Sequence, residues 1–268
     1  MIKSLYRSVR EFSIQMKKRN ISAFAASTAF FFFLSLVPML IMVCTIIPYT
    51  PLTEENLLEA VTDLVPPQLD GLAAGLISNV YDKSAGILSV AIIATIWSAG
   101  KGVMGLMQGL NAVNDVEEHR NYFVVRGVAS FYTLVMLLVL ILSLFVMVFG
   151  EQLVLLIWHR IPQLKRLIAF LLNFRFLAVW GILILLFAGI YAYVPDRKQK
   201  FKEQIPGAVF SSVGWSILSF GISMYLYYGN PDGIYGSLSV IIVVLLWMYF
   251  CMYIILVGAY LNKNFWNL

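Results

Sequence analysis

The chain has few side chains that could carry out chemistry. Among its 268 residues only 12% are charged, two are cysteines and two are histidines. Cys44 and Cys251 both fall inside long apolar runs, where small buried thiols are expected and a disulfide framework is not. His119 and His159 lie near helix ends that we expect on opposite sides of a membrane, so they cannot share a metal ion. The sequence therefore predicts no metal site and no cofactor.

Acidic residues are also scarce on the side of the membrane that we expect to face the cytoplasm. Metal-dependent hydrolysis of a phosphodiester needs clustered carboxylates or histidines, which hold cations and activate water. The segment DVEEH, residues 115–119, is the only such cluster on that side, and a short solvated acidic run is its commoner explanation. No nucleotide-binding motif stands out. We therefore expect a protein that is not an enzyme and has no nucleic-acid partner.

Long apolar runs are what the sequence has in excess. Hydrophobic residues make up 60% of the chain and its mean hydropathy is +0.84, whereas a soluble domain is about 45–50% apolar. Runs of about 20 apolar residues span a bilayer as helices. The sequence predicts an all-α polytopic membrane protein, a single membrane domain over residues 1–268 with six transmembrane helices. The expected spans are residues 22–47, 87–108, 128–149, 176–194, 207–228 and 234–260.

Three segments outside these spans have the pattern of interfacial helices. Residues 1–21 are basic, with apolar positions at helical spacing, which is typical of an amphipathic helix on an anionic membrane surface. Residues 48–86 form a long loop in which TEENLLEAVTDLV begins like a capped helix. Residues 152–175 contain an apolar run too short to span and several cations. We expect helices at the membrane surface in the first and third segments. In residues 48–86 we expect a helix pair that caps the bundle or lies on the outer leaflet.

The charges of the loops predict the orientation. The N-terminal segment and the loop PDRKQKFKEQIP are rich in lysine and arginine, whereas the loop at residues 48–86 is acidic. Because cytoplasmic loops carry an excess of Lys and Arg, both termini and the basic loop are expected inside, and residues 48–86 outside. The loop between the third and fourth spans conflicts with this orientation, but the reverse orientation would violate three segments to satisfy one.

Four stretches together resemble the YihY/BrkB family of integral membrane proteins, which formerly carried a ribonuclease BN-like name. They are AASTAFFFFLSLVPML at residues 25–40, IWSAGKGVMGLMQGLNAVNDVEEHRNYFVVR at 96–126, IPGAVFSSVGWSI at 205–217, and the closing segment at 235–262. The resemblance implies six transmembrane helices in the bacterial plasma (inner) membrane with both ends cytoplasmic. For function it implies ion–proton exchange or the handling of envelope lipids, beside the older ribonuclease name. One departure is GAYLN at residues 258–262, where the family often has Gly-Ala-Glu-x-Asn.

Lys101 is the most unusual residue of the second span, because it stands between two glycines inside an apolar run. It lies about 21 Å along the span and about 9 Å from the cytoplasmic edge of the hydrocarbon core. A lysine there either snorkels to the interface or binds an anion. Lys101, Gln108 and Asp115 are seven residues apart and share a helix face, beside small residues suited to close helix packing. A buried cation of this kind requires an anionic head group, or Asp115, as its partner.

We expect a protein that transports or flips an anionic lipid or an envelope-lipid precursor, with anionic phospholipids as its partners. One alternative is a cation–proton antiporter. Such a protein usually has acidic residues deep in the membrane, and no acid lies well inside a predicted span. The other alternative is a membrane scaffold without transport. Hinge positions are expected at Pro38, Pro206 and Gly207. The candidate ligand-binding residues are Lys101, Gly102, Gly105, Gln108, Asn111, Asp115, Arg197 and Lys198.

Overall fold

The part of the chain that the structure describes contains helices and no strand. This computed structural model describes residues 2–46, 58, 71, 75, 85–135, 137–138, 175–197, 199–228 and 237–265. Within these described ranges, four helices are long and apolar enough to cross a membrane: Ile21–Met42, Ser89–Asn114, Phe201–Tyr228 and Leu238–Asn264. Two shorter apolar helices are Tyr122–Val135 and Trp180–Tyr193. The predicted all-α membrane fold is confirmed, while the count of six spans stays a prediction.

For the first, second, fourth, fifth and sixth spans, the helix bounds agree with the prediction to within three residues, except at two ends that we expect on the inside of the membrane. We name the ends expected on that side the inner ends. The second and sixth spans were expected to stop at residues 108 and 260, but the helices continue to Asn114 and Phe265. Sequence reasoning ended each span at its first polar residues, whereas tertiary contacts hold these last turns in place. The helices are α1 (Ile2–Lys18), α2 (Ile21–Ile46), α5 (Ala85–Asn114), α8 (Arg175–Tyr193), η4 (Phe201–Gln204), α9 (Ile205–Tyr228) and α10 (Ser237–Phe265).

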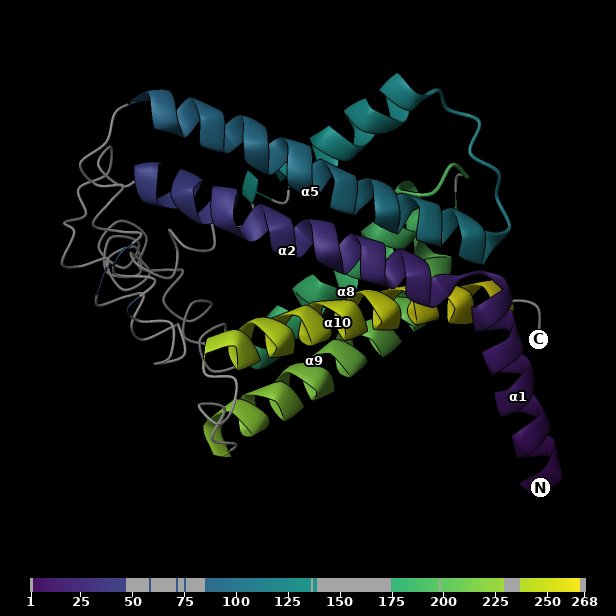
Figure 1. Ribbon diagram of the computed structural model, residues 1–268. Helices are drawn as coiled ribbons and strands as arrows, with labels where there is room; N and C mark the ends of the chain where they lie inside the picture. The colour runs from purple at the N-terminus through teal and green to yellow at the C-terminus, as the bar shows by residue number, and fades with distance from the viewer. Residues whose placement is uncertain are drawn as a thin grey trace, which may run out of the picture.

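The amphipathic segment at the N-terminus forms α1, as its apolar spacing predicts. Figure 1 shows α1 leaving the bundle at the end where the chain also terminates. Asn20 turns the chain from α1 into α2 with a φ of 51°, a left-handed conformation that asparagine tolerates better than most residues. The Asn20 carbonyl accepts hydrogen bonds from the N–H groups of Ala23 and Phe24 at 3.0 and 3.2 Å, which starts α2 directly after the turn.

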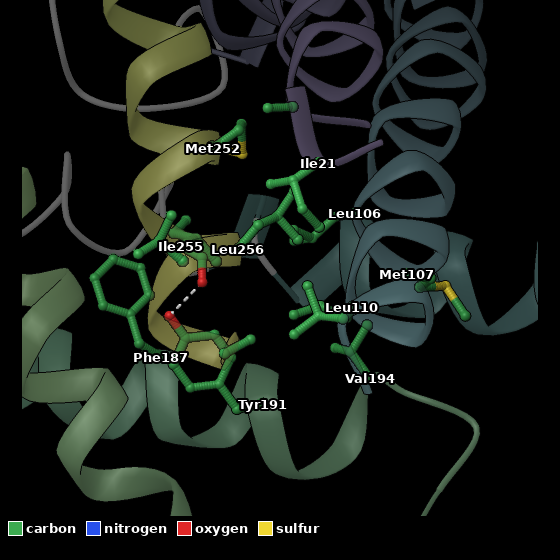
Figure 2. Close-up of a cluster of buried hydrophobic side chains, with 14 of the residues drawn as sticks. Ile21, Leu106, Met107, Leu110, Phe187, Tyr191, Val194, Met252, Ile255 and Leu256 are labelled. Atoms are coloured by element: carbon green, nitrogen blue, oxygen red, sulfur yellow. Dashed lines mark hydrogen bonds between the residues drawn. The ribbon is translucent and has the colours of Figure 1, made fainter. Parts of the chain in front are cut away.

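In Figure 1, α2 and α5 lie side by side, and α10 packs against α2 on one side and α9 on the other. Helix α8 packs against α9. Figure 2 shows where these helices meet: Ile21 of α2, Leu110 of α5 and Leu256 of α10 point toward one another, beside Tyr191 of α8. All four side chains are fully or almost fully buried. This cluster lies near the inner ends of α2, α5 and α10, and it joins these three helices to α8.

The glycines of α5 permit the close packing that their spacing predicts. A Cβ atom on Gly102 would lie 2.9 Å from the Phe32 ring, and one on Gly105 would lie 2.9 Å from Thr28 Oγ1. A Cβ atom on Gly109 would lie equally close to Leu256 of α10. Small residues let helix backbones approach closely in a membrane, where packing rather than the hydrophobic effect drives helix association.

A second close approach joins α9 to α10. A Cβ atom on Gly207 would collide with the carbonyl oxygen of Gly258, and one on Gly258 would collide with Ser211 Oγ. The side chain of Asn262 accepts a hydrogen bond from the Gly207 N–H at 2.6 Å and donates to the Gln204 carbonyl at 3.1 Å. Asn262 thus satisfies one of the otherwise unpaired N–H groups at the start of α9.

The three predicted hinge positions, Pro38, Pro206 and Gly207, all lie within helices. Helix α2 runs through Pro38 without interruption, although proline removes one backbone hydrogen bond there. Pro206 lies in the first turn of α9, where its missing N–H costs little, and Gly207 is fixed against α10. Movement at these positions remains a prediction. The helices expected within 48–86 and 152–175 fall outside the described residues, apart from helical Leu58, Gly71 and Gly75, the start of α5 at Ala85, and the start of α8 at Arg175.

Candidate functional site

A carboxylate at the inner end of α5 ties three parts of the chain together. Asp115 Oδ2 accepts a hydrogen bond from Arg19 at 2.9 Å and forms a short ion pair with Lys263 of α10. The same two cations donate to the carbonyl oxygen of Val113, at 3.0 Å from Arg19 and 3.2 Å from Lys263. Cations are favoured at this position because the last carbonyls of a helix carry partial negative charge. We refer to Arg19, Asp115 and Lys263 as the inner latch.

The backbone places Asp115 at this position. Asp115 has a φ of 53°, so α5 ends in a left-handed residue. The N–H of Val116 donates to the Asn111 carbonyl at 3.0 Å, and the N–H of Asp115 donates to the Ala112 carbonyl at 3.5 Å. This is the Schellman arrangement, which usually has glycine where Asp115 stands. An aspartate tolerates the conformation and adds a charge that binds Arg19 and Lys263.

A second polar cluster lies beside the latch and fixes the loop that follows α5. Asn111 donates to Glu118 at 2.8 Å and accepts a hydrogen bond from the Asp196 N–H at 2.9 Å. Arg120 donates from Nε to Glu118 at 2.6 Å and forms an ion pair with Asp196 at 3.2 Å. The N–H of His119 also donates to Asp196, at 2.9 Å. The DVEEH segment is therefore a structural cluster that joins α5 to the end of α8.

The pKa values of these carboxylates are all lowered. For Asp115, burial opposes ionisation, but the hydrogen bond from Lys263 and the charges of Arg19, Lys263 and Lys18 together lower its pKa below 3.8. The pKa of Glu118 is lowered chiefly by its hydrogen bond from Arg120, and that of Asp196 chiefly by the N–H of His119. Three ionised carboxylates held by fixed cations favour a structural role, because a general acid or base would need a pKa near neutrality.

Lys101 lies in a different environment. Its side chain is exposed on the surface of α5, and Nζ lies 5.2 Å from the centroid of the Phe31 ring of α2. The expected contact with Asp115 is not formed, because fourteen residues separate the two along α5, about 21 Å. The interaction with the ring is a cation–π contact, which does not neutralise the ammonium group as a carboxylate would.

Arg126 is a second cation at the same level, and sequence reasoning did not select it. Its guanidinium lies 4.4 Å from the centroid of the Trp97 ring and donates to the Trp97 carbonyl at 2.9 Å. A Cβ atom on Gly100 would lie 3.6 Å from Arg126 Nη1. Arg126 and Lys101 therefore border the same turn of α5. A signal was present in the sequence, since Arg126 closes the longest stretch that carries the family resemblance.

Neither of these two cations has a carboxylate partner in the part of the chain that the structure describes. The ion pairs found there all involve the inner latch, the cluster around Asp196, and Lys200 with Glu203. The described parts of α2, α5, α9 and α10 contain no Asp or Glu. Lys101 and Arg126 thus place two positive charges beside the membrane part of α5, with aromatic rings as their neighbours. We refer to this pair as the α5 cation pair.

The other predicted ligand residues divide into two groups. Gln108 and Arg197 are exposed and remain candidates, while Lys198 lies outside the described residues. Gly102 and Gly105 are buried against α2, so a head group cannot reach their backbone on that face, contrary to the prediction. Asn111 is 4% exposed and engaged in the polar cluster, and Asp115 belongs to the latch. These four residues take part in packing or in polar contacts within the protein, and a role for them in ligand binding stays a prediction.

Comparison with known proteins gives the family. The family described as Virulence factor BrkB matches residues 13–265. The chain belongs to this family. One relative, the putative ribonuclease-like protein YfkH of Bacillus subtilis (strain 168), is 31% identical over 251 residues, covering 89% of this chain and 87% of the relative. The predicted resemblance is confirmed.

Other relatives match shorter parts of the chain. A UPF0761 membrane protein of Pseudoalteromonas translucida (strain TAC 125) is 30% identical over 84 residues, covering 31% of this chain and 28% of the relative. Another from Vibrio vulnificus (strain YJ016) is 32% identical over 74 residues, covering 27% and 24%. No solved structure matches the chain. These results agree with a multi-pass membrane protein of the BrkB family.

The residue that departs from the expected family motif has a clear structural role. Tyr260 stands where the family often has glutamate. Its ring lies edge-on to Phe12 of α1, with centroids 5.6 Å apart, and the guanidinium of Arg19 lies over it at 5.4 Å. A cation–π contact at this position leaves Arg19 available to pair with Asp115.

Proposed function

We propose that this BrkB-family protein transports or flips an anionic amphiphile, namely a phospholipid or an envelope-lipid precursor. The observation that carries the proposal is the α5 cation pair, Lys101 and Arg126, which has no carboxylate partner among the described residues. Lys and Arg are rare within membrane segments, where they mark substrate pathways or pair with other groups. Lipid phosphates are the abundant anions of a membrane, and a lipid that is moved across the core carries its phosphate past this level.

The two side chains suit a phosphate in different ways. An arginine binds a phosphate through two parallel hydrogen bonds, whereas a lysine acts as a compact point charge. Aromatic rings hold both cations at the helix surface without neutralising them. Gln108 is exposed and lies two turns beyond Lys101 on the same face, so it can donate a further hydrogen bond on the way to the inner leaflet.

The alternatives have less support in the described residues. An antiporter normally holds its proton or cation on acids deep in the membrane, and the described parts of α2, α5, α9 and α10 contain none. Metal-assisted hydrolysis needs a cluster of metal ligands, and no such group lies among the described residues. We therefore propose a protein that is not an enzyme. Cleavage of RNA by the purified protein, lost in Asp115→Asn, would contradict this.

Reconstitution into liposomes tests the transport proposal. Acyl-labelled phosphatidylglycerol and phosphatidylcholine are incorporated, and the fraction that a membrane-impermeant quencher can reach is followed over time. We expect faster movement of the anionic lipid, a several-fold loss in Lys101→Met and in Arg126→Met, and partial activity in Lys101→Arg. The control Arg10→Met removes a charge from an exposed position of α1.

Two outcomes would contradict the proposal in different ways. Equal rates in the wild type, Lys101→Met and Arg126→Met would show that the cation pair has no part in lipid movement. No movement of either lipid by the wild type, with the protein correctly folded, would contradict transport and favour the scaffold.

We also propose that both termini face the cytoplasm of a bacterial plasma membrane, because the basic segments are cytoplasmic by the positive-inside rule. Single cysteines at Glu54 and Arg197, in a chain with Cys44 and Cys251 replaced by serine, test this orientation. A membrane-impermeant maleimide should label position 54 in intact cells and position 197 only after permeabilisation. Labelling of position 197 in intact cells would reverse the orientation.

A further inference from the structure

A cavity of about 230 Å³ lies between the helices at the level of the α5 cation pair. Its wall is formed by α2, α5, the helix Tyr122–Val135 with Leu137, α9 and α10. The residues that matter most here are Ser35, Thr95, Ala99, Thr133, Trp215 and Trp247. The remaining lining residues are apolar, including Phe32, Met248 and Met252.

Four polar side chains of the wall already have partners within the protein. The hydroxyl of Thr95 donates to the Ala91 carbonyl at 2.7 Å, and that of Thr133 donates to the Ala129 carbonyl at 2.9 Å. Ser35 donates to the Phe32 carbonyl at 2.7 Å, and the Trp247 indole donates to Ser219 at 3.2 Å. A polar ligand would lose its hydrogen bonds with water and gain few in return, which is unfavourable. The wall therefore suits a hydrocarbon.

The cavity lies deep along the helices. Ala99 is fifteen residues from the inner end of α5 at Asn114, which corresponds to about 22 Å along the helix axis. In a hydrocarbon core about 30 Å thick, the apolar molecules available at that depth are lipid chains. A dry apolar cavity of about 150 Å³ accepts a molecule the size of benzene, so this one has room for a segment of one chain.

Arg126 of the α5 cation pair lies on a helix that also lines the cavity. Arg126 lies seven residues before Thr133 on one helix, and residues at this spacing share a helix face. On α5, the cavity residue Ala99 is followed directly by Gly100, which Arg126 contacts. Along this helix the backbone of Arg126 lies about two turns, or about 10 Å, from that of the cavity residue Thr133. An anionic head joined to a hydrocarbon chain matches this pair of features.

We propose that the cavity binds one hydrocarbon chain of an anionic lipid whose phosphate contacts Arg126. The inference rests on the proposed function, because it assigns the chain-binding part of the same site. Side chains from five helices line the cavity, and it still has room for a ligand. Each helix contributes apolar surface, and the threonine hydroxyls remain bound to their own helices.

Fluorescence quenching tests the proposal directly, because Trp215 and Trp247 line the cavity. The reporter protein keeps these two tryptophans and carries phenylalanine at positions 97, 158, 180 and 266. It is placed in phosphatidylcholine nanodiscs that contain small fractions of phosphatidylglycerol brominated in one chain. A second reporter keeps only Trp180, which is exposed on α8. We expect saturable quenching of the cavity reporter at fractions of brominated lipid that barely affect Trp180.

Filling the cavity provides the matched comparison. Ala99→Leu should remove the excess quenching, whereas Ala94→Leu should preserve it, because Ala94 lies on the same helix and does not line the cavity. Thr133→Leu fills the cavity from a different helix and replaces Ala99→Leu if that variant fails to fold. Arg126→Met should shift saturation to higher fractions of the anionic lipid and leave brominated phosphatidylcholine unaffected.

The outcomes separate this inference from the proposed function. Quenching in proportion to the lipid fraction, equal in both reporters, would overturn the inference, as would excess quenching that persists in Ala99→Leu. Excess quenching in a protein that moves no lipid would support the cavity and contradict transport. Lipid movement without excess quenching would support transport and contradict the cavity.

Discussion

The inner end of the bundle and its middle differ in how they treat polar groups and space. At the inner end, Asp115, Glu118 and Asp196 each meet cations, and Gly207 and Gly258 bring two backbones into contact. In the middle, Lys101 and Arg126 contact aromatic rings, and side chains from five helices line a cavity. The contrast shows polar groups paired within the protein at the inner end, and it motivates the proposal that the middle binds a ligand.

This difference follows from the medium around each region. At the end of a helix, water and loops supply carboxylates and unpaired backbone groups, so cations find partners within the protein. Inside a bilayer no water compensates an unpaired charge, so a cation without a carboxylate is expensive unless a ligand joins it. We therefore expect substitutions at the inner end to affect stability, and substitutions in the middle to affect lipid binding.

The largest loss of stability is expected from Gly207→Ala. The added methyl group collides with the backbone of Gly258, which cannot move aside as a flexible side chain would. Overpacking of this kind costs about 1–3 kcal/mol or more. Gly221→Ala is the control, because the same helix leaves open space around Gly221. Thermal unfolding in detergent measures both, and equal melting temperatures would show that the close approach is unimportant.

Asn262→Leu is expected to have the next largest effect. Asn262 is 4% exposed and bonds the Gly207 N–H and the Gln204 carbonyl. Its removal leaves buried polar groups without partners, at a cost of about 1–3 kcal/mol. Asn264→Leu, which loses one bond to the Tyr260 carbonyl within α10, should cost much less. Similar denaturation midpoints for the two variants would argue against this capping role.

Asp115→Asn tests the inner latch and its dependence on pH. Because the Asp115 side chain is 60% exposed, we expect a loss of about 1 kcal/mol or less at neutral pH. The pKa of Asp115 is lower in the folded protein than its ordinary value of 3.8, so its contribution is present above that pH. It is lost as the pH falls below 3.8, when the folded carboxylate becomes protonated.

We therefore expect the difference in unfolding free energy between the wild type and Asp115→Asn to be smaller below about pH 4 than at about pH 6. A difference that grows on acidification would contradict the assigned ion pairs. Asp196→Asn should show the same trend, because its pKa is lowered as well.

The double variant Lys101→Met, Arg126→Met should change stability least. Both replacements keep an apolar stem beside an aromatic ring. The variant loses two cation–π contacts, each worth about 0.5–1 kcal/mol at an exposed site, and the Arg126 hydrogen bond to the Trp97 carbonyl. These losses are offset because two charges without a carboxylate partner among the described residues are removed from the membrane. Native mass spectrometry should nevertheless show a several-fold loss of bound phosphatidylglycerol. A large fall in melting temperature with lipid binding intact would reverse the proposed division between the two regions.

The sequence was sufficient for the features that depend on composition and period. Apolar runs predicted helices α2, α8, α9 and α10 with starts within three residues of those observed, because a helix in lipid must satisfy its own backbone. Amphipathic spacing predicted α1. The glycines at 102, 105 and 109 predicted a tightly packed face, which α2 and α10 occupy.

The site was predicted less completely, since its partners are far apart in sequence. Lys101 was selected because a charge in an apolar run is visible in one segment. Arg126 approaches Trp97 across 29 residues, and Lys263 meets Asp115 across 148. No local pattern indicates such pairs, so the partners of Asp115, Arg19 and Lys263, were not predicted.

By itself, the sequence determined a BrkB-family membrane protein made of helices, because hydrophobicity and helical period are properties of each segment alone. Only the tertiary structure decided which polar residues serve the fold. It turned Gly102 and Gly105 toward α2, enclosed Asn111 between Glu118 and Asp196, and left Lys101 and Arg126 without a carboxylate among the described residues. The physical reason is that the free energy of a charge in a membrane depends on its neighbours, and packing brings those neighbours together.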